Sequence, residues 1–244
     1  MSEPFLSIVI PAYNEALRLG NTLEKVRQYL ESRNYAGELL VVDDGSTDQT
    51  GEFLQEVQRL HPALRVLRND SNRGKGFSVR RGVLEARGEL VLFTDADLSA
   101  PIEETNKLLA ALESSGADAV VGSRALQRRL IGVHQPWWRE WAGRAFNHLV
   151  RFFTGLNIRD TQCGLKLFRR ASTRRAFELQ RVHGFGFDPE VLFLIERFGG
   201  KVVEVPVRWN DNPATKVRFL RDALRMFLDL ITLRWRAATG QYRS

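Results

Sequence analysis

Two aspartates separated by one residue, Asp95 and Asp97, follow the apolar run Leu90–Thr94. In an extended segment, residues two apart point to the same side, so both carboxylates could act together. Such oxygens suit Mg²⁺ or Mn²⁺, which proteins usually hold through one or two carboxylates plus the phosphates of a substrate. The alternative is a polar turn in which Asp97 caps the helix expected after Pro101. The pattern alone leaves both interpretations open.

A second acidic pair, Asp43 and Asp44, follows another apolar run. One carboxylate would accept a hydrogen bond from a nucleotide base or ribose, or Asp44 or Ser46 would cap the next helix. A third run leads into the glycine-rich segment 72–76 (Asn-Arg-Gly-Lys-Gly). This segment matches neither the P-loop nor the dinucleotide-binding pattern. Glycines that open a helix still offer backbone N–H groups to an anion.

Several other chemistries lack the residues that they need. Cys163 is the single cysteine, so a disulfide within the chain is impossible and we expect a structural thiol. The four histidines show no metal-ligand spacing, and a Gly-x-Ser-x-Gly nucleophile motif is missing from the sequence. The acidic pairs and the glycine-rich segment therefore carry the functional prediction.

These segments share a position, because each follows a predicted strand. Apolar runs predict strands at Leu6–Pro11, Leu39–Asp43, Arg65–Leu67, Leu90–Thr94 and Ala119–Gly122. Helical patterns between them cover Glu15–Ser32, Thr47–Leu60, Gly76–Ala86 and Ile102–Ser114. The alternation predicts an α/β fold with a mostly parallel sheet and helices on both faces. Ligands bind outside the carboxyl ends of strands in such a sheet, where the candidate residues would gather.

The second half has a different pattern. It predicts a helix from Pro136 to about Phe153, a loop at 160–164, and a helix over Pro189–Phe198. Lys201–Trp209 predicts a strand, antiparallel at the sheet edge, and Lys216–Ala238 the longest helix. We expect one domain at 1–215, divided into a first part (1–124) and a second part (125–215). An amphipathic helical extension would cover 216–244.

Composition and charge narrow the possible partners. The 244 residues are 43% apolar and 27% charged, an ordinary balance for a globular protein. The net charge of +7 combines −6 over residues 1–123, +10 over 124–176, −2 over 177–215 and +5 over 216–244. The basic blocks indicate an anionic partner, with nucleic acid, a phosphorylated substrate and a membrane surface all open. We expect no signal peptide or transmembrane helix, and a cytoplasmic location.

Two predicted helices carry apolar stripes flanked by arginines. One stripe consists of Trp137, Trp138, Trp141, Phe146, Leu149, Phe152 and Phe153. The other consists of Val217, Leu220, Leu224, Phe227, Leu228, Ile231 and Trp235. Either both helices pack on the domain, or one or both lie in a membrane interface with their arginines near lipid phosphates. The periodicity alone does not decide between the two.

Four motifs together resemble the family 2 glycosyltransferases: Pro-Ala-Tyr-Asn-Glu at 11–15, Val-Val-Asp-Asp-Gly-Ser at 41–46, segment 72–76, and Asp-Ala-Asp at 95–97. Segments 158–168, 187–192 and 229–236 resemble the polyprenyl-phosphate branch, and most of all its dolichyl-phosphate β-glucosyltransferases. The resemblance implies a GT-A fold, a metal-dependent nucleotide-sugar site and an inverting mechanism. It also implies that 1–215 is the catalytic domain, with a nucleotide-sugar half at 1–124 and an acceptor half at 125–215. Eukaryotic members of that branch carry an N-terminal membrane anchor, whereas this sequence begins near the first predicted strand.

The resemblance also implies roles for individual residues. Asp95 and Asp97 would hold Mg²⁺ or Mn²⁺ and the diphosphate. The nucleotide-sugar site would comprise Pro11, Ala12, Tyr13, Glu15, Asp43, Asp44, Lys75, Asp95, Ala96, Arg124 and Lys216. Arg124, Arg139 and Lys216 would contact donor and acceptor phosphates. The catalytic set would be Asp97, Arg124, Arg139, Asp160 and Asp188, with the last two near the acceptor.

The expected reaction transfers a hexose, glucose from UDP-glucose, to a polyprenyl or dolichyl phosphate at a membrane surface. A lipid monophosphate is already anionic near neutral pH because its second pKa is about 6, so it needs no strong base. It needs cationic groups that hold two anions together, and the basic block at 124–176 supplies them. The alternatives are another sugar such as mannose from GDP-mannose, a non-lipid acceptor, or a non-enzymatic nucleic-acid-binding protein. The last leaves Asp95 and Asp97 unexplained, so we expect no nucleic acid.

Overall fold

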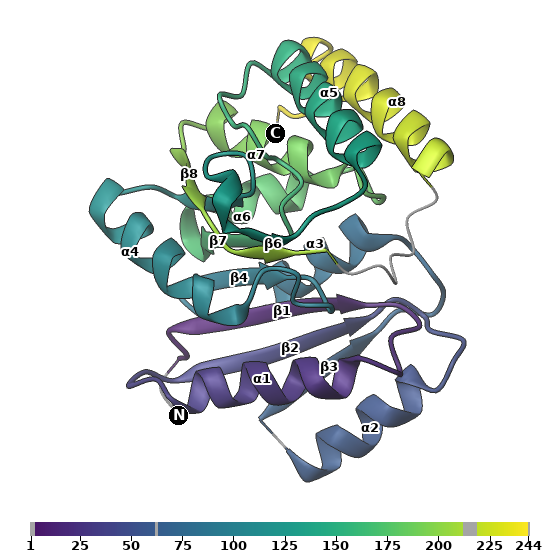
Figure 1. Ribbon diagram of the computed structural model, residues 1–244, viewed down its shortest axis with the longest axis vertical. Helices are drawn as coiled ribbons and strands as arrows, with labels where there is room; N and C mark the ends of the chain where they lie inside the picture. Colours follow the sequence, from purple (N-terminus) through teal and green to yellow (C-terminus); the bar gives the residue numbers. More distant parts are fainter. Residues whose placement is uncertain (1–2, 62, 212–218, 244) are drawn as a thin grey trace.

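A computed structural model describes residues 3–61, 63–211 and 219–243 (Figure 1). The apolar runs form one seven-stranded sheet with the order β3-β2-β1-β4-β7-β5-β8. Its strands are β1 (Leu6–Ala12), β2 (Gly37–Asp43), β3 (Leu64–Arg68), β4 (Leu90–Thr94), β5 (Ala119–Ser123), β7 (Leu165–Arg169) and β8 (Val202–Pro206). Only β7 runs antiparallel to its neighbours in this sheet. The predicted mostly parallel α/β sheet is therefore confirmed.

Helices cover both faces of the sheet, because successive strand residues point to opposite sides. On one face, α1 (Leu19–Glu31), α2 (Thr50–Leu60) and α4 (Thr105–Ser115) share a core with Ile8 and Ile10. On the other, α3 (Lys75–Glu85), α6 (Arg170–Leu179) and α7 (Phe187–Arg197) share a core with Val9. Two longer helices, α5 (Trp137–Thr154) and α8 (Phe219–Ala238), add a layer beyond α7 at the top of Figure 1.

Three elements in the second half were absent from the sequence prediction: β7, α6 and the short strand β6 (Ile131–Val133). β7 reads Leu-Lys-Leu-Phe-Arg, and its charged residues hide the alternation of a buried strand. Lys166 is nevertheless buried, because Asp188 neutralises it from α7. A contact between residues far apart in the sequence therefore makes this strand possible.

The expected antiparallel edge strand at Lys201–Trp209 was wrong in direction. β8 does lie at the edge, but it pairs parallel with β5. After α7 the chain returns to the start of β5, where Asp118 N–H donates to Lys201 O over 2.9 Å. Because β8 begins beside the start of β5, it must run the same way. Trp209 instead belongs to β9 (Trp209–Asn210), which pairs with β6 (Ile131–Val133) in a second small sheet.

The predicted last helix, Lys216–Ala238, corresponds to α8, and Lys216 itself lies outside the described residues. α8 buries Leu230, Leu233 and Ala237 in the same core as α7. Within the described ranges, no helix has the length and apolar character needed to cross a bilayer.

Candidate functional site

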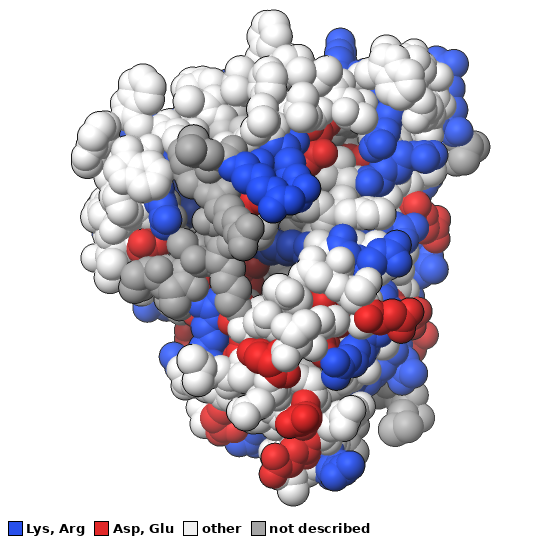
Figure 2. All heavy atoms as spheres, turned by 90° about the vertical axis from the view of Figure 1, so that its right-hand side faces the viewer, with Lys and Arg blue, Asp and Glu red and all other residues white. Residues whose placement is uncertain are grey.

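The carboxyl ends of β1, β2 and β4 meet at one edge of the sheet, on the right in Figure 1 and facing the viewer in Figure 2. Because β7 runs antiparallel, its beginning reaches the same edge and places Gly164 beside the acidic pair. Asp95 N–H donates to Gly164 O over 3.1 Å. A Cβ on Gly164 would lie 1.9 Å from Asp95 Oδ2, so only glycine leaves room for that carboxylate.

A tight turn displays the two aspartates. Leu98 adopts a φ of 48°, which is rare for a bulky side chain, and its N–H donates to Asp95 O over 3.2 Å. One turn into α1, Thr22 donates its hydroxyl to Ala96 O over 2.6 Å. Burial, together with the neighbouring charge of Asp95, raises the pKa of Asp97. A cation bound between these carboxylates would relieve both effects.

Lys75 supplies one such cation from the glycine-rich segment. Its Nζ lies 2.6 Å from Asp95 Oδ1 and close to the rings of Phe93 and Phe185, 5.2 and 5.8 Å from their centroids. Burial opposes its charge, but Asp95 and Asp188 outweigh burial and raise the pKa of Lys75. Lys75 therefore stays charged and partly balances the acidic pair.

A second ion pair, between Lys166 and Asp188, is almost fully buried and lies next to Lys75. Lys166 Nζ lies 2.6 Å from Asp188 Oδ1 and donates to Cys163 O over 2.5 Å. Burial raises the pKa of Asp188, although Lys166 and Lys75 oppose that shift. Asp188, which was expected near the acceptor, is thus enclosed beside Lys75 rather than presented to a cavity. Its position suits a group that holds Lys75 in place.

Asp43 and Asp44 have different roles. One carboxylate holds the local backbone, and the other also has an oxygen that could contact a ligand. Asp44 accepts hydrogen bonds from Arg73 N–H and Gly74 N–H, over 3.0 and 2.8 Å, so it anchors the glycine-rich segment. Asp43 accepts one from Ser46 N–H over 2.9 Å. Its other oxygen is buried and, among the described residues, accepts no hydrogen bond, although Arg68 Nε lies 3.5 Å from it as an ion-pair partner. This oxygen therefore retains hydrogen-bonding capacity for a ligand beside Arg68.

The segment Pro11–Glu15 borders the same site. Asn14 N–H donates to Ser46 Oγ over 2.9 Å, which joins this segment to the turn after β2. The Glu15 carboxylate holds the guanidinium of Arg18, and the charges of Asp97 and Asp95 also help to raise the pKa of Arg18. Pro11, Ala12, Tyr13, Glu15 and Ala96 thus lie around the edge that holds Asp43 and Asp95, as their predicted grouping requires.

A cavity of about 710 Å³ opens beside this edge, bounded by α5, α8 and the segment after β5. Arg124, Arg139 and Asp160 all line it. Arg124 and Asp160 form a two-pronged ion pair with both N···O distances at 2.7 Å, and Arg124 also stacks 5.1 Å from the Trp209 ring. Burial opposes the Asp160 charge, but Arg124 outweighs burial and lowers the pKa of Asp160. Asp160 therefore fixes Arg124 in the cavity wall.

Most of the predicted site residues lie in two neighbouring places, the acidic edge of the sheet and the arginine-lined cavity. Phe185 connects them, because it lines the cavity and approaches Lys75. Lys216 lies outside the described residues. Sequence reasoning assigned no role to Gly164, Lys166 or Arg18, although the motif at 158–168 contains the first two. Only their contacts across the sheet and across the β1–α1 connection reveal what they do.

The donor set suits a divalent ion that shares its coordination with a substrate. Asp95 and Asp97 offer two carboxylates at an open edge, and the described part of the chain holds no cluster of three or more metal-ligating side chains. Two carboxylates plus phosphate oxygens are the usual environment of Mg²⁺ in nucleotide sites. The residues present therefore fit the predicted Mg²⁺ or Mn²⁺.

Comparisons with known proteins identify the family. Residues 7–177 match the family described as Glycosyl transferase family 2. The chain belongs to this family. It is 36% identical to dolichyl-phosphate beta-glucosyltransferase ALG5C of Trichomonas vaginalis, over 95% of this chain and 71% of that protein. It is 36% identical to the Drosophila melanogaster dolichyl-phosphate beta-glucosyltransferase, over 98% of this chain and 77% of that protein.

Solved glycosyltransferases confirm the GT-A fold predicted for this family 2 chain. Glucosyl-3-phosphoglycerate synthase from Mycobacterium tuberculosis, solved with Mn²⁺, UDP-glucose and phosphoglyceric acid, aligns over 94% of this chain and 80% of that one. The TM-score is 0.66 at 20% identity. Mannosyltransferase PcManGT from Pyrobaculum calidifontis, solved with GDP-Man and Mn²⁺, aligns over 98% and 65%, with a TM-score of 0.62 at 20% identity.

Replacing Gly164 by alanine tests the placement of Asp95. The new methyl group must displace the Asp95 carboxylate, so we expect Mn²⁺-dependent binding of UDP to weaken at least about tenfold, because a misoriented metal ligand typically costs 10- to 100-fold. Isothermal titration calorimetry measures the loss. Gly184→Ala is the matched control, since a Cβ there meets nothing within 4 Å. Equal binding by both variants would contradict this placement.

Replacing Asp160 by asparagine tests the buried ion pair. Arg124 would lose its charged partner, so we expect the free energy of unfolding at pH 7 to fall by about 3 kcal/mol. The folded-state pKa of Asp160 is lowered, so its contribution is present above the unfolded pKa of about 4 and is lost as pH falls through the folded pKa. The difference between the two proteins should shrink below about pH 4.

Chemical denaturation across a pH series measures that difference. Glu24→Gln is the control, because it breaks an exposed pair with Arg27 and should cost almost nothing. An Asp160→Asn protein as stable as the wild type at pH 7 would show that the pair does not hold Arg124.

Proposed function

We propose that this family 2 glycosyltransferase transfers glucose from UDP-glucose to the phosphate of dolichol or a related polyprenol, with inversion. The names of its relatives support the substrates. The observation that carries the proposal is an arginine-lined cavity that adjoins the acidic edge on one side and two helices with exposed apolar side chains on the other. A lipid phosphate needs such a cationic site below an apolar surface.

In this proposal the donor lies across the carboxyl ends of β1, β2 and β4. The Asp43 oxygen that accepts no hydrogen bond within the protein, and that pairs with Arg68, would accept one from the base. Pro11, Ala12, Tyr13 and Glu15 border the nucleoside. Asp95 and Asp97 would hold Mg²⁺ or Mn²⁺, which would neutralise charge on the departing diphosphate. Lys75, already charged beside Asp95, lies within reach of the same phosphates.

The acceptor phosphate would occupy the cavity. Arg124, fixed by Asp160, and Arg139 from the first turn of α5 offer guanidinium groups to it. Two anions would otherwise repel each other, so these cations permit the phosphate oxygen to approach the anomeric carbon. Because the acceptor is already anionic, Asp160 and Asp188 are not required as bases. Their ion pairs instead keep Arg124 and Lys75 in position.

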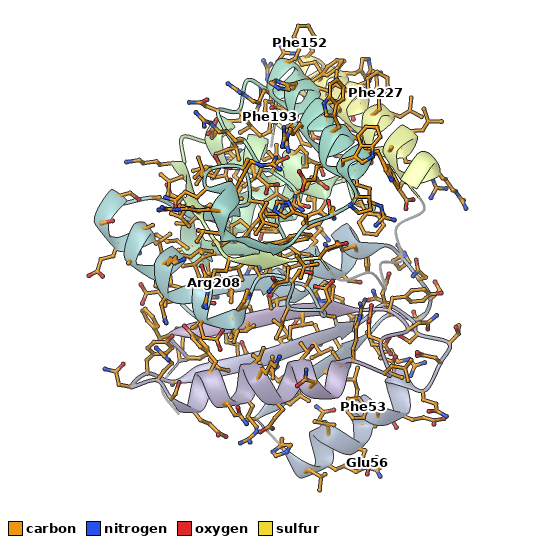
Figure 3. All side chains as sticks on the ribbon, viewed as in Figure 1. Phe53, Glu56, Phe152, Phe193, Arg208 and Phe227 are labelled. Carbon is orange, nitrogen blue, oxygen red and sulfur yellow. The ribbon has the colours of Figure 1, made fainter. Side chains whose placement is uncertain are left out.

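We extend the proposal to a peripheral membrane position on α5 and α8, which pack side by side. Phe153 of α5 and Phe227 of α8 make an edge-to-face contact, while Phe152 projects outward at the top of Figure 3. The exposed large apolar side chains are Trp137, Trp138, Trp141, Leu149, Phe152, Leu224, Leu228, Ile231 and Trp235. In Figure 2 acidic residues gather in the lower half, away from this end. Such a surface fits an interface that contains anionic lipids.

Product analysis tests the proposed reaction. The protein, Mn²⁺, a short polyprenyl phosphate and a panel of UDP- and GDP-sugars are incubated, and the organic phase is analysed by mass spectrometry. We expect a hexosyl-phospholipid from UDP-glucose, and a loss of at least about 100-fold in Asp97→Asn. If only GDP-mannose gives a product, the transferred sugar is mannose and the assignment of glucose is wrong. If only a water-soluble acceptor gives a product, the assignment of a lipid acceptor is wrong.

Vesicle binding tests the membrane surface separately. Trp141 and Phe152 are 69% and 81% exposed, so the variant Trp141→Glu/Phe152→Glu should fold normally. It should sediment at least about tenfold less with vesicles that contain anionic phospholipid, because both charges oppose insertion of the apolar side. Leu60→Glu is the control, since Leu60 is 70% exposed at the end of α2. Unchanged sedimentation of the double variant would exclude this surface.

A further inference from the structure

A buried tyrosine follows α8, outside the part of the chain that matches the family. Gly240 adopts a φ of 76° and turns the chain back after the helix, and Gln241 N–H donates to Arg236 O over 3.0 Å. Tyr242 is only 1% exposed, and its hydroxyl donates to Glu190 Oε1. A phenol buried this fully must have its hydroxyl satisfied, so the contact with Glu190 fixes the turn.

Glu190 connects Tyr242 to the segment that precedes α7, because its two carboxylate oxygens bond to different partners. Its side chain is fully buried, and Oε2 accepts hydrogen bonds from Arg181 N–H and Val182 N–H over 3.0 and 2.7 Å. Arg181 also donates from its guanidinium to Gln241 O over 3.4 Å. The turn after α8 and the start of segment 181–186 are therefore held by one carboxylate.

Segment 181–186 packs directly against the residues on either side of Lys75. Phe77 N–H donates to His183 O over 3.2 Å. A Cβ on Gly76 would lie 2.7 Å from Val182 O, and one on Gly74 would lie 2.4 Å from His183 O. With no free space between the two segments, a shift of segment 181–186 must move the backbone that carries Lys75.

We propose that Tyr242 is a positioning residue for the donor site: through Glu190 and segment 181–186 it holds Lys75 in place beside Asp95. The inference rests on the proposed function only in taking this edge as the nucleotide-sugar site. Tyr242 touches neither the acidic pair nor the cavity. Its effect on donor binding would come through Lys75.

Tyr242→Phe keeps the ring and removes the hydroxyl that bonds to Glu190. We expect Mn²⁺-dependent UDP binding, measured by calorimetry, to weaken about three- to tenfold. This is less than the full effect of losing one hydrogen bond to a charged group, because only part of that loss reaches Lys75. The KM for UDP-glucose should rise similarly. Tyr29→Phe is the matched control, because Tyr29 is also buried and donates to Asn106 Oδ1 over 2.9 Å between α1 and α4.

A double-mutant cycle separates positioning from general destabilisation. In a Lys75→Met background, which keeps the stem against Phe93 and Phe185, Tyr242→Phe should weaken UDP binding no further. Losses that multiply, or equal losses in Tyr29→Phe, would overturn the proposal. If Tyr242→Phe does not fold, Glu190→Gln tests the same link, because its amide disturbs the contact while one oxygen remains for the backbone.

The two proposals fail in different ways. The binding measurement needs no lipid, so coupling between Tyr242 and Lys75 in a protein that glucosylates no lipid would refute only the proposed acceptor. Normal UDP binding by Tyr242→Phe in a protein that does glucosylate polyprenyl phosphate would refute only the positioning role.

Discussion

The site depends on keeping two neighbouring carboxylates ionised at the edge of a buried sheet. Burial and the charge of Asp95 both raise the pKa of Asp97, so the surrounding structure must supply positive charge. Positive and negative side chains alternate behind the pair. Lys75 forms an ion pair with Asp95, Asp188 lies next to Lys75, and Lys166 forms an ion pair with Asp188. Both lysines also lie beside the ring of Phe93. A divalent ion bound to the pair would complete this balance together with the phosphates that it accompanies.

The antiparallel strand β7 makes that arrangement possible. It brings Gly164 against the Asp95 carboxylate and places Lys166 in an ion pair with Asp188, the carboxylate beside Lys75. The segment before β7 places Asp160 in the cavity wall, where it binds Arg124. A parallel strand in the same place would begin at the opposite edge and deliver none of these groups. The fold thereby joins the acidic edge, which we propose binds the nucleotide and which is built from the first half of the chain, to a cationic cavity built from the second.

The sequence predicted the first half well, because continuous apolar runs and helical periodicity there act locally. It placed Asp43, Asp95 and Asp97 at the carboxyl edge for the same reason. It missed β7, since Lys166 looks solvent-exposed until Asp188 is known to face it. It also gave β8 the wrong direction, which depends on the contact of Lys201 with Asp118. Asp43 and Asp44 differ in role, and Asp188 is buried, because of hydrogen bonds and ion pairs with residues far away in the sequence. The spacing of residues does not reveal such contacts.

The most direct test of the account is a calorimetric titration of the wild-type protein with UDP, in Mn²⁺ and in excess chelator. The account predicts that Mn²⁺ tightens UDP binding at least about tenfold, because the acidic pair repels a bare diphosphate and attracts a metal-bound one. Equal affinity in chelator would contradict it, since Asp95 and Asp97 would then have no part in holding the nucleotide.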